Sequence, residues 1–117
     1  MNSDGRAVVV EDRELEHDDY ARLFQGHRHA NTGISFILVD MPPGGRVRLH
    51  RHAYREIFIV QEGEATFTAG PDTLVVRAPR VVIVPAGVPH AFANTGDVAL
   101  RQVDIHLNER TITEWLE

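Results

Sequence analysis

Short apolar runs rich in β-branched residues recur along the chain, and turn sequences separate them. The runs lie at residues 6–10, 34–39, 56–60, 65–69, 73–77, 81–84 and 99–107. Glycine and proline mark the turns, as in the PPGG sequence at 42–45 and the PAGVP sequence at 85–89. Short strands with regular turn signals and almost no helical periodicity indicate an all-β sandwich or barrel.

Two segments depart from this pattern. Residues 11–24 are charged and only loosely patterned, which indicates a turn of helix before a strand near residues 20–26. The sequence TITEWLE at 111–117 is typical of a short C-terminal helical turn, because Thr111 and Glu114 fit a capping box. We expect this turn to pack on the barrel through its apolar face.

Some predicted strands are apolar on both faces. The sequences IFIV at 57–60 and VVIV at 81–84 do not alternate between apolar and polar residues. A barrel wall with one solvated face should alternate, so another layer or a second subunit must cover these strands. A homodimer with shared sheets is the economical explanation for so small a chain.

Composition and charge narrow the function. A chain of 117 residues suits one domain with one core. The net charge of −5 argues against a nucleic-acid partner. The chain has no cysteine, which excludes disulfides, thiolate nucleophiles and sulfur ligands, so any metal must be held by nitrogen and oxygen.

No targeting or membrane signal stands out. Only residues 7–10 are apolar before the first charged block, which is too short for the core of a signal peptide. No apolar run reaches the length of a membrane span. We therefore expect a soluble, cytoplasmic protein without a membrane partner.

Histidines and a glutamate gather in the sequence HRHAYRE that begins at His50. His50 and His52 are two residues apart, so on a strand their side chains project from the same face. Glu56 begins the next apolar run and can face the same point from across a hairpin. His90, which begins another run after a tight Pro/Gly turn, is the fourth candidate. Three imidazole nitrogens and one carboxylate oxygen suit a divalent ion of iron, manganese, nickel, zinc, copper or cobalt.

A second HRH sequence lies at His27–His29. It sits in a Gly/Asn-rich stretch without a glutamate at the matching distance. H-x-H alone is a weak signal, so we do not expect a physiological metal there.

The spacing around His50 is more specific. It reads G-x5-H-x-H-x3-E-x6-G from Gly44 to Gly63 and resembles the first motif of the cupin superfamily. The second cupin motif reads G-x5-P-x-G-x2-H-x3-N. Its later positions are matched here by Pro85, Gly87, His90 and Asn94. Pro79 stands where that motif has its first glycine, so we expect a changed turn and not a lost metal.

The resemblance covers roughly residues 33–107, in the pattern of a small single-domain cupin. It implies a conical jelly-roll β-barrel, also called a double-stranded β-helix, with an N-terminal extension at 1–32 and a C-terminal cap at 108–117. Carried over position by position, the metal ligands are His50, His52, Glu56 and His90. Without metal, the same side chains would form a polar cluster that needs other partners.

Neighbouring residues suggest how a ligand is held. Arg46 and Arg48 share the parity of His50, so they are expected at the mouth of the site, where arginine favours an anionic ligand. Phe58 shares the parity of Glu56 and Phe92 that of His90, so both are expected as apolar walls. The same pattern has an alternative explanation, in which the arginines point into solvent and the phenylalanines only pack in the core.

The last predicted strand alternates polar and apolar residues. Gln102, Asp104 and His106 form its polar face, which is solvated unless the barrel has a polar lumen. In a polar lumen these side chains reach the pocket or orient a metal-bound imidazole. His106 is the one catalytic candidate outside the ligand set.

Two classes of function follow. The leading hypothesis is a metalloenzyme acting on a small molecule, similar to cupin dioxygenases or to cupin isomerases and lyases. The alternative is a non-catalytic cupin that binds or senses a small molecule, and a purely structural metal is a third reading. Neither the substrate nor the metal follows from these residues.

Overall fold

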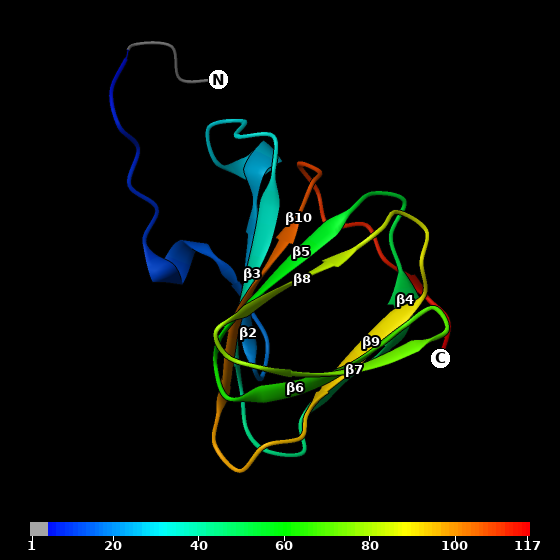
Figure 1. Cartoon of the computed structure of the whole chain (residues 1–117). Helices are drawn as coiled ribbons and strands as arrows, with labels where there is room; N and C mark the ends of the chain where they lie inside the picture. Colours follow the sequence, from blue (N-terminus) through cyan, green and yellow to red (C-terminus); the bar gives the residue numbers. More distant parts are fainter. Residues whose placement is uncertain (1–4) are drawn as a thin grey trace.

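The computed structural model describes residues 5–117 and folds them into two antiparallel sheets that face each other (Figure 1). The six-stranded sheet has the order β1 (Glu16–His17), β2 (Ala21–Gln25), β3 (Ser35–Met41), β10 (Leu100–His106), β5 (Glu56–Glu62) and β8 (Arg80–Val84). The five-stranded sheet has the order β11 (Glu114–Trp115), β4 (Arg46–Arg51), β9 (His90–Asn94), β6 (Glu64–Ala69) and β7 (Asp72–Arg77). The expected all-β jelly-roll barrel is confirmed.

The core between the sheets has an apolar and a polar part. Burial alternates along the central strands β5 and β10, as expected for strands with one face inside the barrel. The buried apolar residues are Val39, Met41, Phe58, Val60, Ala65, Phe67, Val76, Val84, Phe92 and Leu100. Buried polar residues include His50, His52, Glu56, His90, Gln102, Asp104 and His106. The sheets therefore bring the predicted ligands and the polar face of the last strand inside the same barrel.

The outer face of the six-stranded sheet is also apolar. Ile57 pairs with Ile105 on one side and with Ile83 on the other. Ile59 likewise pairs with Val103 on one side and with Val81 on the other. Ile83 is 64% exposed. The expectation of strands that are apolar on both faces is confirmed, whereas a second subunit that covers them remains a prediction.

The N-terminal segment differs in part from the expectation. Its turn of helix is present as a 3-10 turn, η1 (Asp12–Glu14), and the strand expected near 20–26 is β2. The strand expected at residues 6–10 is wrong, because this stretch joins neither sheet and runs away from the barrel (Figure 1). Val9 is 84% exposed, so β-branched residues alone do not make a strand without an edge to pair with.

The C-terminal segment also differs. The predicted helical turn is wrong, because Glu114 and Trp115 form the short strand β11 along the edge of β4. The Leu116 N–H donates to the Leu49 carbonyl at 3.0 Å. The Glu114 carboxylate pairs with Arg51 and not with the backbone of Thr111. The open edge of β4 thus offers hydrogen bonds that a single helical turn cannot match.

The helical segments of the described chain are η1 and η2 (Gly26–Arg28), each three residues long. None of its helices has the length and apolar character needed to cross a membrane. The Ala78–Pro79 peptide bond is cis and lies in the β7–β8 turn, where the sequence departs from the cupin motif.

Candidate metal centre

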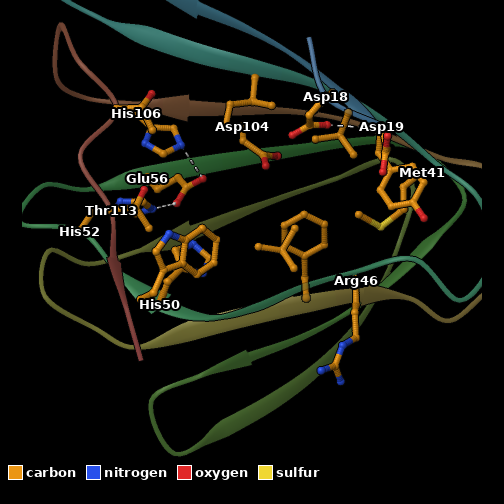
Figure 2. A pocket seen from close by; sticks show the side chains of 18 residues that line it. Asp18, Asp19, Met41, Arg46, His50, His52, Glu56, Asp104, His106 and Thr113 are labelled. Atoms are coloured by element: carbon orange, nitrogen blue, oxygen red, sulfur yellow. Dashed lines mark hydrogen bonds and ion pairs between the residues drawn. The ribbon is translucent and has the colours of Figure 1, made fainter. Parts of the chain in front are cut away.

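One end of the barrel encloses a cavity of about 480 Å³ (Figure 2). His50, His52, Glu56 and His106 line one part of it, and apolar side chains of β3, β4 and β9 line another. The β1–β2 turn and the C-terminal segment complete the lining, with Trp115 among the residues of that segment. The four polar residues come from three strands and the hairpin that follows one of them, so the site depends on the closed barrel.

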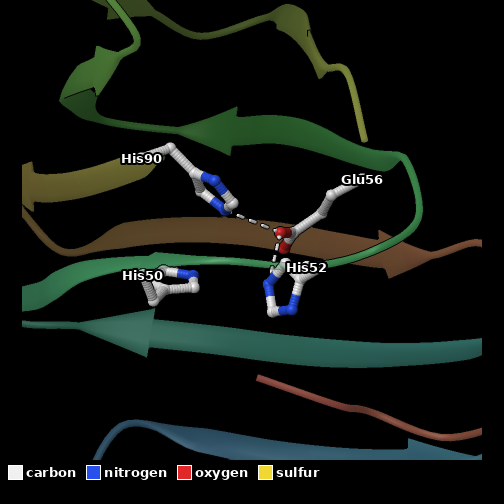
Figure 3. Close-up of side chains that lie close together, drawn as sticks. All are labelled: His50, His52, Glu56 and His90. Atoms are coloured by element: carbon white, nitrogen blue, oxygen red, sulfur yellow. Dashed lines mark hydrogen bonds and ion pairs between the residues drawn. The ribbon is translucent and has the colours of Figure 1, made fainter. Parts of the chain in front are cut away.

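The predicted ligands meet at this end of the cavity (Figure 3). His50 lies near the end of β4, His52 just after it, and Glu56 and His90 begin β5 and β9. One ligand atom of each lies within 4.8 Å of the ligand atoms of the others. All four side chains are buried, with at most 5% of each residue exposed. The structure therefore brings the whole predicted set together.

Backbone carbonyls orient the three imidazoles. The Nδ1 atoms of His50, His52 and His90 each lie within hydrogen-bond distance of a backbone oxygen. The acceptors are the carbonyls of Arg48, Ile112 and Val88, at 2.6, 2.8 and 2.9 Å respectively. A carbonyl only accepts, so each Nδ1 must carry the proton, and each Nε2 presents a lone pair. This is the arrangement that metal-binding histidines use.

Glu56 faces these lone pairs. Its Oε1 lies 3.0 Å from His90 Nε2 and 3.1 Å from His52 Nε2. The buried His52 Nε2 makes no hydrogen bond to any described residue. Three lone pairs and a carboxylate that converge in a buried place repel one another unless a cation or protons lie between them. The donor set therefore fits a divalent metal ion.

The protonation states also suit a metal. Burial, together with the neighbouring His90 and His52, lowers the pKa of His50 to about 4, so its imidazole is neutral at pH 7. Burial alone would raise the pKa of Glu56, but its contacts with His106, His52 and His90 outweigh burial and lower it below the ordinary value. A neutral imidazole and an ionised carboxylate are the forms that bind metal.

Tyr54 contacts His106, which in turn contacts the second carboxylate oxygen of Glu56. The Ile112 N–H donates to the Tyr54 hydroxyl at 3.1 Å, and that hydroxyl lies 2.6 Å from His106 Nδ1. Burial raises the pKa of Tyr54 to about 12, so the phenol keeps its proton. His106 Nε2 lies 3.1 Å from Glu56 Oε2. His106 therefore lies against Oε2, whereas His52 and His90 lie against Oε1.

Asp104 is a buried acid on the same strand as His106. It is 3% exposed, lines the cavity, and accepts a hydrogen bond from Gln102 Nε2 at 2.9 Å. Burial and the charge of Glu56 raise its pKa well above the ordinary value. The polar face expected on the last strand thus points into the barrel, where it brings a carboxyl group with a raised pKa to the cavity.

Residues 37–106 match the family model described as "Cupin domain". The chain belongs to the cupin family. All four residues of the cluster lie within the matched segment. The membership of the cupin family that the two motifs indicate is therefore confirmed.

Curated relatives of this cupin have different names. The polyketide synthase CurC of Streptomyces cyaneus is 36% identical over 72 residues, which are 61% of this chain and 46% of CurC. The oxalate-binding protein of Thermotoga maritima is 29% identical over 83 residues, 70% of this chain and 69% of that protein. Auxin-binding protein 1 of Arabidopsis thaliana is 25% identical over 108 residues, 79% of this chain and 54% of its own. The chain thus spans about half the length of the first and third relatives.

Solved structures share the fold. Bacillus subtilis oxalate decarboxylase superposes with a TM-score of 0.76 at 22% identity, over 87% of this chain and 29% of its own. Oxalate oxidase in complex with the substrate analogue glycolate superposes with a TM-score of 0.66 at 25% identity, over 74% of this chain and 47% of its own. The first likeness shows the barrel alone.

The cupin does not place Arg48 as expected. The pairing of β4 with β9 shifts register between Val47 and His50, so β4 has one extra residue there. Val47, and not Arg48, therefore lines the cavity with His50. The Arg48 guanidinium lies 4.8 Å from the Trp115 ring centroid and donates to the Glu117 carbonyl. The parity argument for Arg48 is wrong.

Of the other residues predicted from the sequence, some line the cavity and some do not. Phe92 lines the cavity, whereas Phe58 is 1% exposed and packs in the core, 4.9 Å from Phe67 between ring centroids. Arg46 borders the cavity, but Figure 2 shows its side chain pointing away from it. His27 and His29 are not part of the metal-type cluster among the described residues. Sequence reasoning missed Tyr54, whose place in the turn after His52 was the only available signal.

Proposed function

We propose that this cupin binds one divalent transition-metal ion through the Nε2 atoms of His50, His52 and His90 and the Oε1 atom of Glu56. One observation carries the proposal. Three buried imidazoles, each with its Nδ1 at a backbone carbonyl, and the Glu56 carboxylate bring their ligand atoms within 4.8 Å of one another. Iron, manganese, nickel, zinc, copper and cobalt all accept these ligands.

The ligand of this centre is a small anionic molecule. A divalent ion with four protein ligands commonly keeps positions for exogenous ligands, and its charge attracts carboxylates. Support comes from the relatives, since one is an oxalate-binding protein and the oxalate oxidase structure contains glycolate. In this cupin the cavity leads directly to the cluster.

Catalysis is the leading reading of the site. When bound, the metal supplies a Lewis acid or a redox centre, as in dioxygenase-like or isomerase- and lyase-like chemistry. His106 and Asp104 line the cavity beside the cluster, and the imidazole and the carboxyl are groups that can hold or move a proton. A pure binding protein does not need two such groups. Non-catalytic binding is the second candidate, favoured by the relative that binds oxalate.

Metal content tests the centre. We expect near one transition-metal ion per chain by elemental mass spectrometry after reconstitution of the wild-type protein. His52→Ala should lose the ion, and His27→Ala, a matched change of the other HRH sequence, should keep it. A wild-type protein that takes up no iron(II), manganese, nickel, copper, cobalt or zinc would contradict the proposal.

We also propose that two copies of the chain associate as a homodimer. Support comes from the outer face of the six-stranded sheet, where apolar residues of β5, β8 and β10 lie side by side.

A further inference from the structure

The cavity is larger than a minimal carboxylate ligand requires. Its volume of about 480 Å³ falls in the range of pockets that hold drug-sized molecules, roughly 300–1,000 Å³. Oxalate and glycolate each have two carbon atoms, and either would leave most of this space to water. The extra space therefore calls for an explanation in terms of what else the ligand contains.

The two parts of the cavity differ in chemistry. Near the cluster, the lining includes the buried polar side chains of His106 and Asp104. Away from it, the wall consists of apolar side chains from three strands. These residues are Ile37, Val39, Met41, Val47 and Phe92. The polarity thus changes along the cavity from the metal end to the apolar wall.

An apolar wall offers little to water. Water needs several polar partners to be held well, and aliphatic side chains provide none. An apolar group that displaces this water gains roughly 25 cal/mol for each Å² removed from solvent. Val39, Met41 and Phe92 are 7%, 1% and 5% exposed, so neighbouring side chains pack against most of their surface. The wall is preformed for an apolar body.

Charged side chains border this wall, since Asp18, Asp19 and Arg46 also line the cavity, and Figure 2 shows Arg46 pointing away from it. Asp104 pairs with Ile37 across β10 and β3, and the buried Gln102 pairs with Val39. Met41, farther along β3, is 1% exposed and pairs with Leu100. A second anionic group on the ligand would lie against this apolar wall or near the carboxylates of Asp18 and Asp19, and both positions are unfavourable.

We infer that the ligand is amphipathic, with an oxyanion head at the cluster and an apolar body of ring size against the wall formed by Ile37, Val39, Met41, Val47 and Phe92. This inference rests on the proposed metal centre and names the class of its ligand. The cluster would hold the oxygens of the head through the proposed metal, and the wall selects for the body.

Two probes with similar heads and different bodies test this class. Oxalate and 3-hydroxy-2-naphthoate both present a carboxylate with a neighbouring oxygen, but only the second has a fused aromatic body. Isothermal titration of the zinc-loaded protein should give at least roughly tenfold tighter binding of the naphthoate, because its rings bury apolar surface. The metal-free protein should bind the naphthoate at least roughly tenfold more weakly than the zinc-loaded protein does.

Identical substitutions inside and outside the cavity provide the control. Val47→Thr and Val39→Thr add a hydroxyl to the wall without changing its shape, and each should weaken naphthoate binding roughly tenfold while oxalate binding stays within about threefold. Val75→Thr, on the exposed outer face of β7, should change neither. Zinc content and circular dichroism confirm that each variant is folded and loaded.

The outcomes separate the two proposals. Equal or tighter binding of oxalate, an unchanged naphthoate affinity in both cavity variants, or zinc-loaded protein that binds neither probe would overturn the amphipathic class and leave the metal centre standing. Naphthoate binding that is as tight without zinc would overturn the placement of the head. If the wild-type protein loads neither zinc nor iron(II), manganese, nickel, copper or cobalt, the proposed function itself is wrong.

Discussion

At the scale of single residues, the candidate centre depends on where protons lie. The cupin spacing predicted which histidines would gather, because positions two apart on a strand share a face. It could not predict their protonation, since the acceptors of the Nδ1 protons come from backbone carbonyls at Arg48, Val88 and Ile112. The Ile112 carbonyl lies 60 positions from His52 in sequence, so only the folded chain shows it.

Asp104 gives a pH-dependent prediction. Burial raises its pKa in the folded state above the unfolded value of about 3.9. Between these two values the folded state holds more protons, so this group makes stability fall as pH rises, by at most about 1.4 kcal/mol per pH unit. The groups around it are Glu56 on β5 and Gln102 and His106 on β10.

The Asp104→Asn change removes this titration and keeps the shape. We expect the free energy of unfolding of the variant, relative to wild type, to increase with pH from about 4 upward. Urea unfolding of the metal-free proteins at a series of pH values measures it. Asp97→Asn, at an exposed position, should show a flat difference. A flat difference for Asp104→Asn as well would show that the buried carboxyl does not hold a proton in the folded state.

At the scale of elements, the sequence predicted some features and could not predict others. Periodicity placed the strands that carry the ligands, and turn signals placed their boundaries. It failed at Arg48 because one extra residue in β4 reverses the alternation, and nothing in the sequence marks this bulge. It failed at residues 111–117 because a short segment takes its conformation from the sheet edge that it meets, not from its own propensity.

The C-terminal segment is therefore part of the site. The Ile112 carbonyl accepts from His52 Nδ1 at 2.8 Å, and the Ile112 N–H donates to Tyr54. Deletion of residues 111–117 should lower zinc affinity at least roughly tenfold, because outer partners of metal ligands contribute on this order. Competition with a chromophoric chelator measures the affinity.

A point change within the segment serves as its control. Glu114→Ala removes an exposed ion pair with Arg51, and such pairs contribute little, so zinc affinity should stay within about threefold. If the deletion leaves zinc affinity unchanged while the barrel stays folded, the hydrogen bonds of Ile112 do not orient His52 for metal. If Glu114→Ala matches the deletion, the effect comes from the loss of β11 pairing and not from Ile112.

At the scale of the whole molecule, the two sheets differ in their outer faces. The six-stranded sheet carries adjacent apolar residues on β10, β5 and β8, with Ile105, Ile57 and Ile83 in one row. The five-stranded sheet places polar residues such as Thr66 and Thr68 on the outer side of β6. Contiguous apolar patches on soluble proteins mark interaction sites, so the six-stranded sheet is the face expected to bind a second copy.

Two residues of equal exposure make this testable. Ile83, on the outer face of the six-stranded sheet, and Val75, on that of the five-stranded sheet, are each 64% exposed. We expect light scattering at micromolar concentration to give twice the chain mass of 13.1 kDa for wild type. Ile83→Asp should shift the protein toward monomer, because a charge buried in an apolar interface is costly, and Val75→Asp should not. A monomeric wild type would contradict the homodimer, and dissociation by Val75→Asp alone would move the interface to the five-stranded sheet.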